Sequence, residues 1–91
     1  MQIEFNPDKA QANLDKHGVS FEDAMLVFFD PDRLDELDGR KDYGEERRIV
    51  IGEIEGRVFV VVYTLRGEVI RLISARKSNE REQRKYRALR A

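Results

Sequence analysis

The sequence predicts a small α+β fold: two N-terminal helices packed on an antiparallel β-sheet of three or more strands, followed by a C-terminal helix. Helical apolar spacing before residue 30, β-branched runs separated by two-residue turns over 47–76, and a capping pattern at the start of 78–91 lead to this fold class. The 91 residues are expected to form one domain, 1–91, with a modest core.

The N-terminal region carries start and stop signals for two helices. Residues 2–5 alternate polar and apolar side chains, as a short strand does, and Asn6-Pro7 then supplies an N-cap and a first-turn proline. Gly18 should end the first helix because it tolerates the left-handed conformation. Ser20 should cap the second helix, whose apolar face ends at Asp30-Pro31.

The next region is an acidic loop, 30–46, with a short edge strand near Leu34–Leu37. Three strands with hairpin turns at Glu55-Gly56 and Arg66-Gly67 should follow. The expected strands are Arg47–Ile54, Arg57–Leu65 and Glu68–Arg76. Asn79 and Glu82 form a capping box at the start of the last helix.

Strand alternation separates the side chains of the sheet into two faces. The predicted turns place Arg47 and Arg71 on a mainly aliphatic face, which the two N-terminal helices are expected to cover. The other face combines Arg48 and Arg76 with aromatic rings, a surface suited to stacking bases and binding phosphates. The alternative is that the third helix covers those rings and the arginines only lie around the edge of the covered surface.

The charge distribution is strongly divided, although the formal net charge is only −1. Residues 1–46 hold five Lys or Arg and thirteen Asp or Glu, giving −8, whereas residues 47–91 hold twelve and five, giving +7. Such asymmetry indicates a basic region for a polyanion, with RNA favoured, although the two halves could simply neutralise each other. The absence of cysteine excludes disulfides, and no apolar run suggests a signal peptide or membrane span, so a cytoplasmic protein is expected.

The sequence lacks the familiar catalytic motifs: it has one histidine, no G-x-S-x-G, no phosphate loop and no paired-histidine metal motif. The acidic residues of 30–46 match no EF-hand spacing, so we predict no metal site. Arginine, lysine, carboxylate and tyrosine remain. These side chains suffice for RNA cleavage, in which cations stabilise the pentacoordinate phosphate.

Several segments, in order along nearly the whole chain, resemble the BrnT family. They are Phe5-Asn6-Pro7-x-Lys9-Ala10, Asn13-x-x-Lys16-His17-Gly18-Val19-Ser20-Phe21-x-x-Ala24, Gly44-Glu45-Glu46-Arg47, Val61-Val62-Tyr63-Thr64 and Ile73-Ser74-Ala75-Arg76-Lys77, followed by Glu82 and Tyr86. The resemblance implies a RelE-like fold and a metal-independent endoribonuclease, without a cofactor, that inhibits translation as the toxin of a type II toxin-antitoxin pair.

The resemblance also implies partners. A BrnA-like antitoxin would neutralise the toxin in a heterotetramer and would itself bind operator DNA, while RNA would be the substrate and no membrane would be involved. The alternative function is a non-catalytic or weakly catalytic partner-binding module that acts with its antitoxin as a transcriptional co-repressor.

Four residues are candidates for catalysis. Arg76, at the end of the last strand beside the last helix, is the candidate phosphate clamp, and a salt bridge at the rim is its alternative role. Arg47 is a second phosphate contact, and Glu46 is either a general base or a solvated loop residue. Tyr86, one helical turn after Glu82, could stack a base or donate a proton, or it could anchor the last helix.

The candidate RNA-binding residues are Lys77, Arg48, Arg71 and Arg81. His17 is the candidate acid or base because its reference pKa is near neutral, and the alternative is that it caps the first helix. Arg57, beside a hairpin turn, is expected to be neutral for cleavage.

Overall fold

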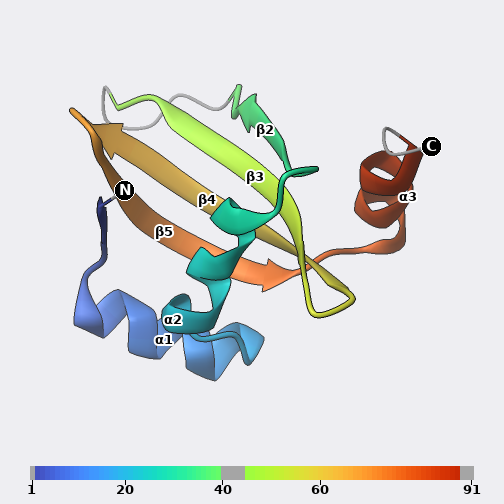
Figure 1. Cartoon of the computed structure of the whole chain (residues 1–91). Helices are drawn as coiled ribbons and strands as arrows, with labels where there is room; N and C mark the ends of the chain where they lie inside the picture. The colour runs from blue at the N-terminus through green and yellow to red at the C-terminus, as the bar shows by residue number, and fades with distance from the viewer. Residues whose placement is uncertain (1, 40–44, 89–91) are drawn as a thin grey trace.

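Five strands form one mixed sheet in the computed structural model, which describes residues 2–39 and 45–88 (Figure 1). The strand order is β1-β5-β4-β3-β2. The strands are β1 (Gln2–Glu4), β2 (Leu34–Leu37), β3 (Arg47–Ile54), β4 (Arg57–Arg66) and β5 (Val69–Lys77). The α+β class is confirmed, but the sheet is not wholly antiparallel, because β1 runs parallel to β5.

The helices start where their capping residues predict, α1 ends at the predicted Gly18, and residues 89–91 of the predicted C-terminal helix lie outside the described residues. The helices are α1 (Pro7–His17), α2 (Phe21–Ala24), the 3₁₀ segment η1 (Met25–Phe29) and α3 (Glu80–Ala88). The Asn6 side chain accepts from two first-turn amides, Gly18 takes the left-handed conformation with φ 70°, and Ser20 accepts from the Asp23 amide. The second predicted helix is thus an α-helical turn that continues as η1. No helix within 2–39 and 45–88 is long and apolar enough to cross a bilayer.

The two hairpins differ in how well the sequence predicts them. Glu55 and Gly56 both have positive φ and form the expected first turn, so Arg47 pairs with Thr64 as predicted. The second turn is wrong by one residue. Gly67, with φ 62°, occupies the first central position rather than the second, which suits a type II′ turn.

A register shift between Val62 and Tyr63 changes which side chains share a face. Tyr63 pairs with Leu72 and Val62 with Ser74, which leaves Ile73 as an extra residue in β5. Because side chains alternate along a strand, one inserted residue reverses every later position. The prediction that Arg76 lies on the face of Arg48 is therefore wrong, and Arg76 shares the face of Arg47 and Arg71.

Helices α1 and α2 and segment η1 cover the face that carries the aromatic rings of β4, not the aliphatic face, so that prediction is also wrong. The Tyr63 ring packs edge-on against Phe28, with the ring centroids 5.1 Å apart. Gly52 allows this packing, since an added Cβ would lie 3.0 Å from the Val27 Cβ. The buried residues of this core are Val19, Phe21, Ala24, Val27, Phe28, Val50, Val61, Tyr63, Ile70, Leu72 and Ala75.

Asn13 ties α1 to β5 and so orients the helical layer. Its amide Nδ2 donates to the Ala75 carbonyl at 2.8 Å and to the Val19 carbonyl at 3.0 Å, and its Oδ1 accepts from the Ala75 amide at 3.0 Å. These buried bonds occupy the backbone of the residue next to Arg76. They hold the end of β5 in place from the covered side of the sheet.

Candidate functional site

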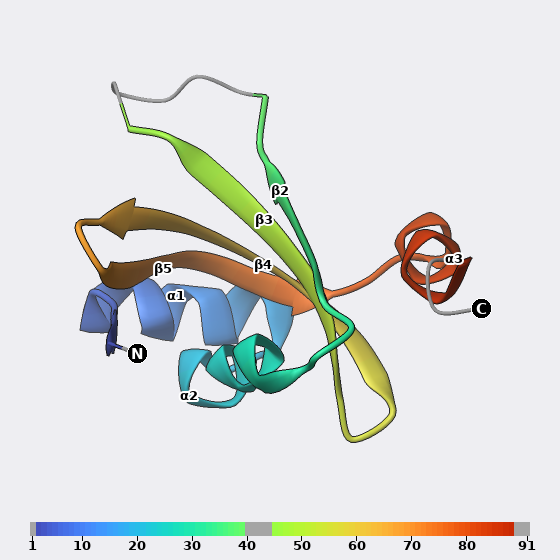
Figure 2. The ribbon, with the colours of Figure 1, turned by 45° about the horizontal axis from the view of Figure 1, so that its top comes forward.

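The sheet face opposite α1 and α2 carries three arginines from β3 and β5, and a fourth, Arg66 at the end of β4, makes an ion pair with Glu45 at 3.0 Å. Arg47 begins β3, whereas Arg71 and Arg76 lie on β5. Within 2–39 and 45–88, only α3 packs on this face, at one end of it, where Tyr86 joins a second core cluster (Figure 2). We call the surface formed by Arg47, Thr64, Arg71, Ser74 and Arg76 the arginine face.

Thr64 lies between two of these arginines. It is the cross-strand partner of both Arg47 and Arg71, so the three side chains point to the same side of the sheet. Thr64 is only 2% exposed. An unsatisfied buried hydroxyl is costly, and the structure offers the Thr64 Oγ1 no hydrogen-bond partner among the described residues. Arg71 also contacts the Glu4 carboxylate at 3.4 Å.

The guanidinium of Arg76 makes a bidentate salt bridge with a carboxylate of α3. Its Nη1 and Nη2 donate to the two carboxylate oxygens of Glu82 at 2.8 and 2.7 Å, and Nη1 also donates to the Lys77 carbonyl at 3.3 Å. Glu82 and Asn79 form the predicted capping box, with bonds of 2.9 and 2.8 Å. The salt bridge that was the alternative role for Arg76 is therefore present, while 40% of the arginine side chain stays exposed.

The Arg76–Glu82 pair predicts a pH dependence of stability. Hydrogen bonds from Arg76 hold the pKa of Glu82 below its ordinary value of 4.5. The pair therefore stabilises the fold above pH 4.5, and this contribution is lost as pH falls from there through the lowered pKa. We expect Arg76→Ala to flatten the decline in the free energy of unfolding over that range, measured by denaturant titration. Lys77→Ala, which removes an exposed cation, should leave the decline as steep as in the parent, and equal slopes in all three proteins would contradict the assignment.

Residues 5–82 match the family model described as the ribonuclease toxin BrnT of type II toxin-antitoxin systems. The chain belongs to the BrnT family. The resemblance seen in the sequence is thereby confirmed, and membership makes the chain a ribonuclease toxin with an antitoxin partner. No curated protein matches the chain. The matched region of this BrnT toxin includes the whole arginine face and ends at Glu82, before Tyr86.

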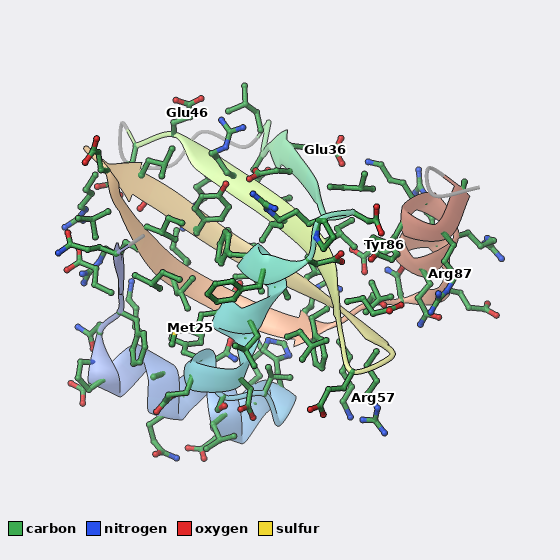
Figure 3. All side chains as sticks on the ribbon, in the orientation of Figure 1. Met25, Glu36, Glu46, Arg57, Tyr86 and Arg87 are labelled. Atoms are coloured by element: carbon green, nitrogen blue, oxygen red, sulfur yellow. The ribbon has the colours of Figure 1, made fainter. Side chains whose placement is uncertain are left out.

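Tyr86 anchors α3 in the BrnT structure. It is 1% exposed and packs with Ile51, Val58 and Val60, and its hydroxyl donates to the Asp30 carboxylate. Figure 3 shows the tyrosine between α3 and the sheet. Of the roles considered for Tyr86, packing is the one its surroundings support, because a ring buried on all sides offers no face to a base.

Arg48 lies on the helix-covered side of the BrnT sheet, away from the arginine face. Its Nε contacts the Asp35 carboxylate at 3.3 Å, and the Tyr63 hydroxyl donates to the same carboxylate. Hydrogen bonding to Tyr63 and then to Asp35 raises the pKa of Arg48. Burial, followed by the Asp35 contact, raises the pKa of Tyr63 to about 12. The network fastens β2 to β3 and β4, which occupies Arg48 in a structural contact.

The remaining candidates are dispersed. Glu46 is exposed just before the start of β3, far from α3 (Figure 3). His17 ends α1 in the helical layer, on the other side of the sheet from the arginine face. Lys77 is exposed at the end of β5, and Arg81 is exposed on α3. The structure therefore brings Arg47, Arg71 and Arg76 to one face, where Tyr86 is buried between α3 and the sheet, and leaves Arg48 and His17 on the other side.

The predicted absence of a metal site concerns the acidic segment 30–46, part of which, 40–44, lies outside the described residues together with Gly44 of the family pattern. In 2–39 and 45–88 no three His, Cys, Asp or Glu side chains gather closely enough to hold a metal ion.

Thr64 and Glu82 are site residues whose roles the sequence reasoning missed. The first hairpin already pairs Thr64 with Arg47, so the correct second turn would have placed Arg71 beside it as well. The sequence predicts Glu82 as a capping residue, but its contact with Arg76 depends on the inserted Ile73. No sequence signal indicates that insertion.

Proposed function

We propose that the chain cleaves RNA on the arginine face without a metal ion and thereby inhibits translation. The observation that carries this proposal is the position of Arg47, Arg71 and Arg76 on one face of a toxin of the BrnT family. Guanidinium groups match the geometry of phosphate oxygens and keep their charge at all physiological pH values. The arginines can therefore stabilise the charge of the pentacoordinate phosphate that forms when the 2′-OH attacks.

Two phosphates, rather than one, fit the spacing of the arginines. Thr64, which pairs with Arg47 and Arg71, and Val60, which pairs with Arg76, are four residues apart on β4. That separation is about 13 Å along a strand. In the proposal Arg76 contacts the scissile phosphate, and Arg47 and Arg71 hold a second phosphate of the same strand. Glu46 lies next to Arg47, where the second phosphate would bind. The proposal therefore gives it no role at the scissile phosphate that Arg76 contacts.

Arg76 must be released from Glu82 before its guanidinium can bind the scissile phosphate. A phosphate replaces the carboxylate as the partner of the guanidinium, and Glu82 keeps its hydrogen bonds with Asn79. The exchange trades one charge-assisted pair for another, so it costs less than freeing a buried arginine would.

The antitoxin belongs to the same proposal. A BrnA-like protein binds this chain as a heterotetramer, prevents RNA from reaching the arginine face and alone contacts operator DNA. Family membership supports an antitoxin, and the concentration of cations on one face supports an acidic contact surface on it.

Purified protein should cut RNA in the presence of EDTA and leave 2′,3′-cyclic phosphate or 3′-phosphate ends, because attack by the 2′-OH needs no metal ion. Product ends are read by phosphatase sensitivity and mass spectrometry, and expression of the chain alone should stop bacterial growth and lower translation. Arg76→Ala protein purified in parallel controls for contaminating nucleases. Strict dependence on added Mg²⁺ would exclude the metal-free mechanism. Absence of cleavage with antitoxin binding intact would favour the co-repressor module.

A further inference from the structure

A cleft of about 340 Å³ lies between the β3–β4 hairpin and the start of α3, outside the arginine face. It is lined by Gly56, Arg57, Val58, Lys77, Ser78, Gln83 and Arg87. Figure 3 shows Arg57 on the hairpin and Arg87 on α3, so the two cations reach the cleft from opposite walls. Segments distant in the sequence thus enclose one basic space.

The charge of the cleft is only partly balanced. Arg57 and Lys77 are exposed, and neither makes an ion pair with any residue in the described parts of the chain. Arg87 contacts the Glu53 carboxylate at 3.4 Å, and half of its side chain remains exposed. Three cations therefore face one carboxylate, which leaves a local excess of positive charge.

The polar lining contains an unused donor. The Ser78 Oγ is buried and has no hydrogen-bond partner among the described residues. The backbone of Ser78 is held at both sides, because its amide donates to the Val58 carbonyl at 3.0 Å and its carbonyl accepts from Gln83 Nε2 at 3.5 Å. A fixed hydroxyl beside cations is a suitable donor for a phosphate oxygen.

We propose that this cleft binds the RNA phosphate next to the one held by Arg76. The inference rests on the proposed function for the identity of the polyanion. Lys77 follows Arg76 directly, and the Arg76 Nη1 donates to the Lys77 carbonyl. Val58 in the cleft and Val60 opposite Arg76 are two residues apart, about 7 Å along β4. Lys77 alternates with Arg76 and so points to the other side of β5. An RNA strand that passes from Arg76 around the end of β5 therefore meets Arg57, Lys77 and Ser78 at its next phosphate.

Phosphate suits the cleft better than a protein segment does. Its only large apolar lining residue is Val58, which is itself buried, so an antitoxin side chain would find little apolar area to cover. The site also gives Arg57 a role in binding that the sequence does not predict.

The test measures binding rather than cleavage. A fluorescent oligouridine with 2′-O-methyl groups cannot undergo attack by the 2′-OH, so its affinity can be titrated over a series of salt concentrations. Arg57→Ala and Lys77→Ala should each weaken binding on the order of tenfold at low salt. Each should also reduce the slope of log affinity against log salt by about 0.7, the value for one phosphate contact on a single strand. The double variant should show the losses of affinity and the reductions in slope of both single variants.

Lys16→Ala is the matched control, because Lys16 is an exposed cation on α1 that does not line the cleft. It should leave the slope unchanged. Ser78→Ala should weaken binding without changing the slope, since it removes a neutral donor. An unchanged slope in both cleft variants overturns the proposal, as does a loss of antitoxin binding with RNA binding intact. A protein that binds the oligomer through the cleft but never cuts RNA would refute the proposed function alone.

Discussion

Arg76→Ala should lower the rate of RNA cleavage about a hundredfold, whereas Glu82→Gln should not lower it. Loss of a cation that stabilises the transition state costs on the order of 3 kcal/mol of barrier, which corresponds to that factor. Glu82 competes with the phosphate for the same guanidinium in the free protein. Weakening that competitor leaves Arg76 in place and makes it easier to reach, so the rate should stay the same or rise. Single-turnover cleavage of a defined RNA measures both changes.

Stability measurements on the same two variants distinguish two roles for Arg76. It either contacts the scissile phosphate or only stabilises the fold through its salt bridge with Glu82. Either substitution breaks the ion pair, and each should cost roughly 1 kcal/mol or less, because 40% of the Arg76 side chain is exposed and solvent screens the pair. Glutamine at position 82 can still cap α3 by accepting from Asn79. If both variants lose activity to the same extent, Arg76 acts through the fold and the phosphate assignment is wrong.

Tyr86→Ala should lower the free energy of unfolding by about 3–5 kcal/mol, the usual cost of removing a buried aromatic ring. The ring fills the space between α3 and the sheet and is one of the largest fully buried side chains. Since small domains are stable by only about 5–15 kcal/mol, this loss should detach α3 or unfold the protein at growth temperature. Urea denaturation followed by circular dichroism measures it.

Tyr86→Phe is the control that separates packing from proton donation. It keeps the ring but leaves the Asp30 carboxylate without the tyrosine hydroxyl, at a cost of about 1–3 kcal/mol. Asp30 still accepts from the amides of Glu53 and Asp32, at 2.8 and 2.9 Å, which limits the loss. Cleavage by folded Tyr86→Phe should match that of the parent. Inactivity of a variant that remains folded would return Tyr86 to the catalytic residues.

Local signals in the sequence determined where the helices begin and where α1 ends. Asn6, Gly18, Ser20 and the Asn79–Glu82 box act through contacts with residues two to four positions away, so their effect can be recognised without the fold. The order of the family motifs likewise requires no coordinates, and it led to the BrnT family that the comparison confirms. The division of charge also belongs to the sequence alone.

Only the tertiary structure decided which side chains meet. The turn at Gly67 and the extra residue Ile73 change the register, and a shift of one residue moves every later side chain to the other face. Arg76 thereby joins Arg47 instead of Arg48.

Burial of the sheet also depended on contacts between distant segments. Gly52 admits η1 to the face that carries Tyr63, so the rings that a sequence pattern assigns to RNA form the core instead. The phosphate cleft has the same origin, since Arg57, Lys77 and Arg87 become neighbours only when the hairpin, the end of β5 and α3 are packed together. Periodicity and capping describe one element at a time, whereas the arginine face and the cleft are properties of how elements pack.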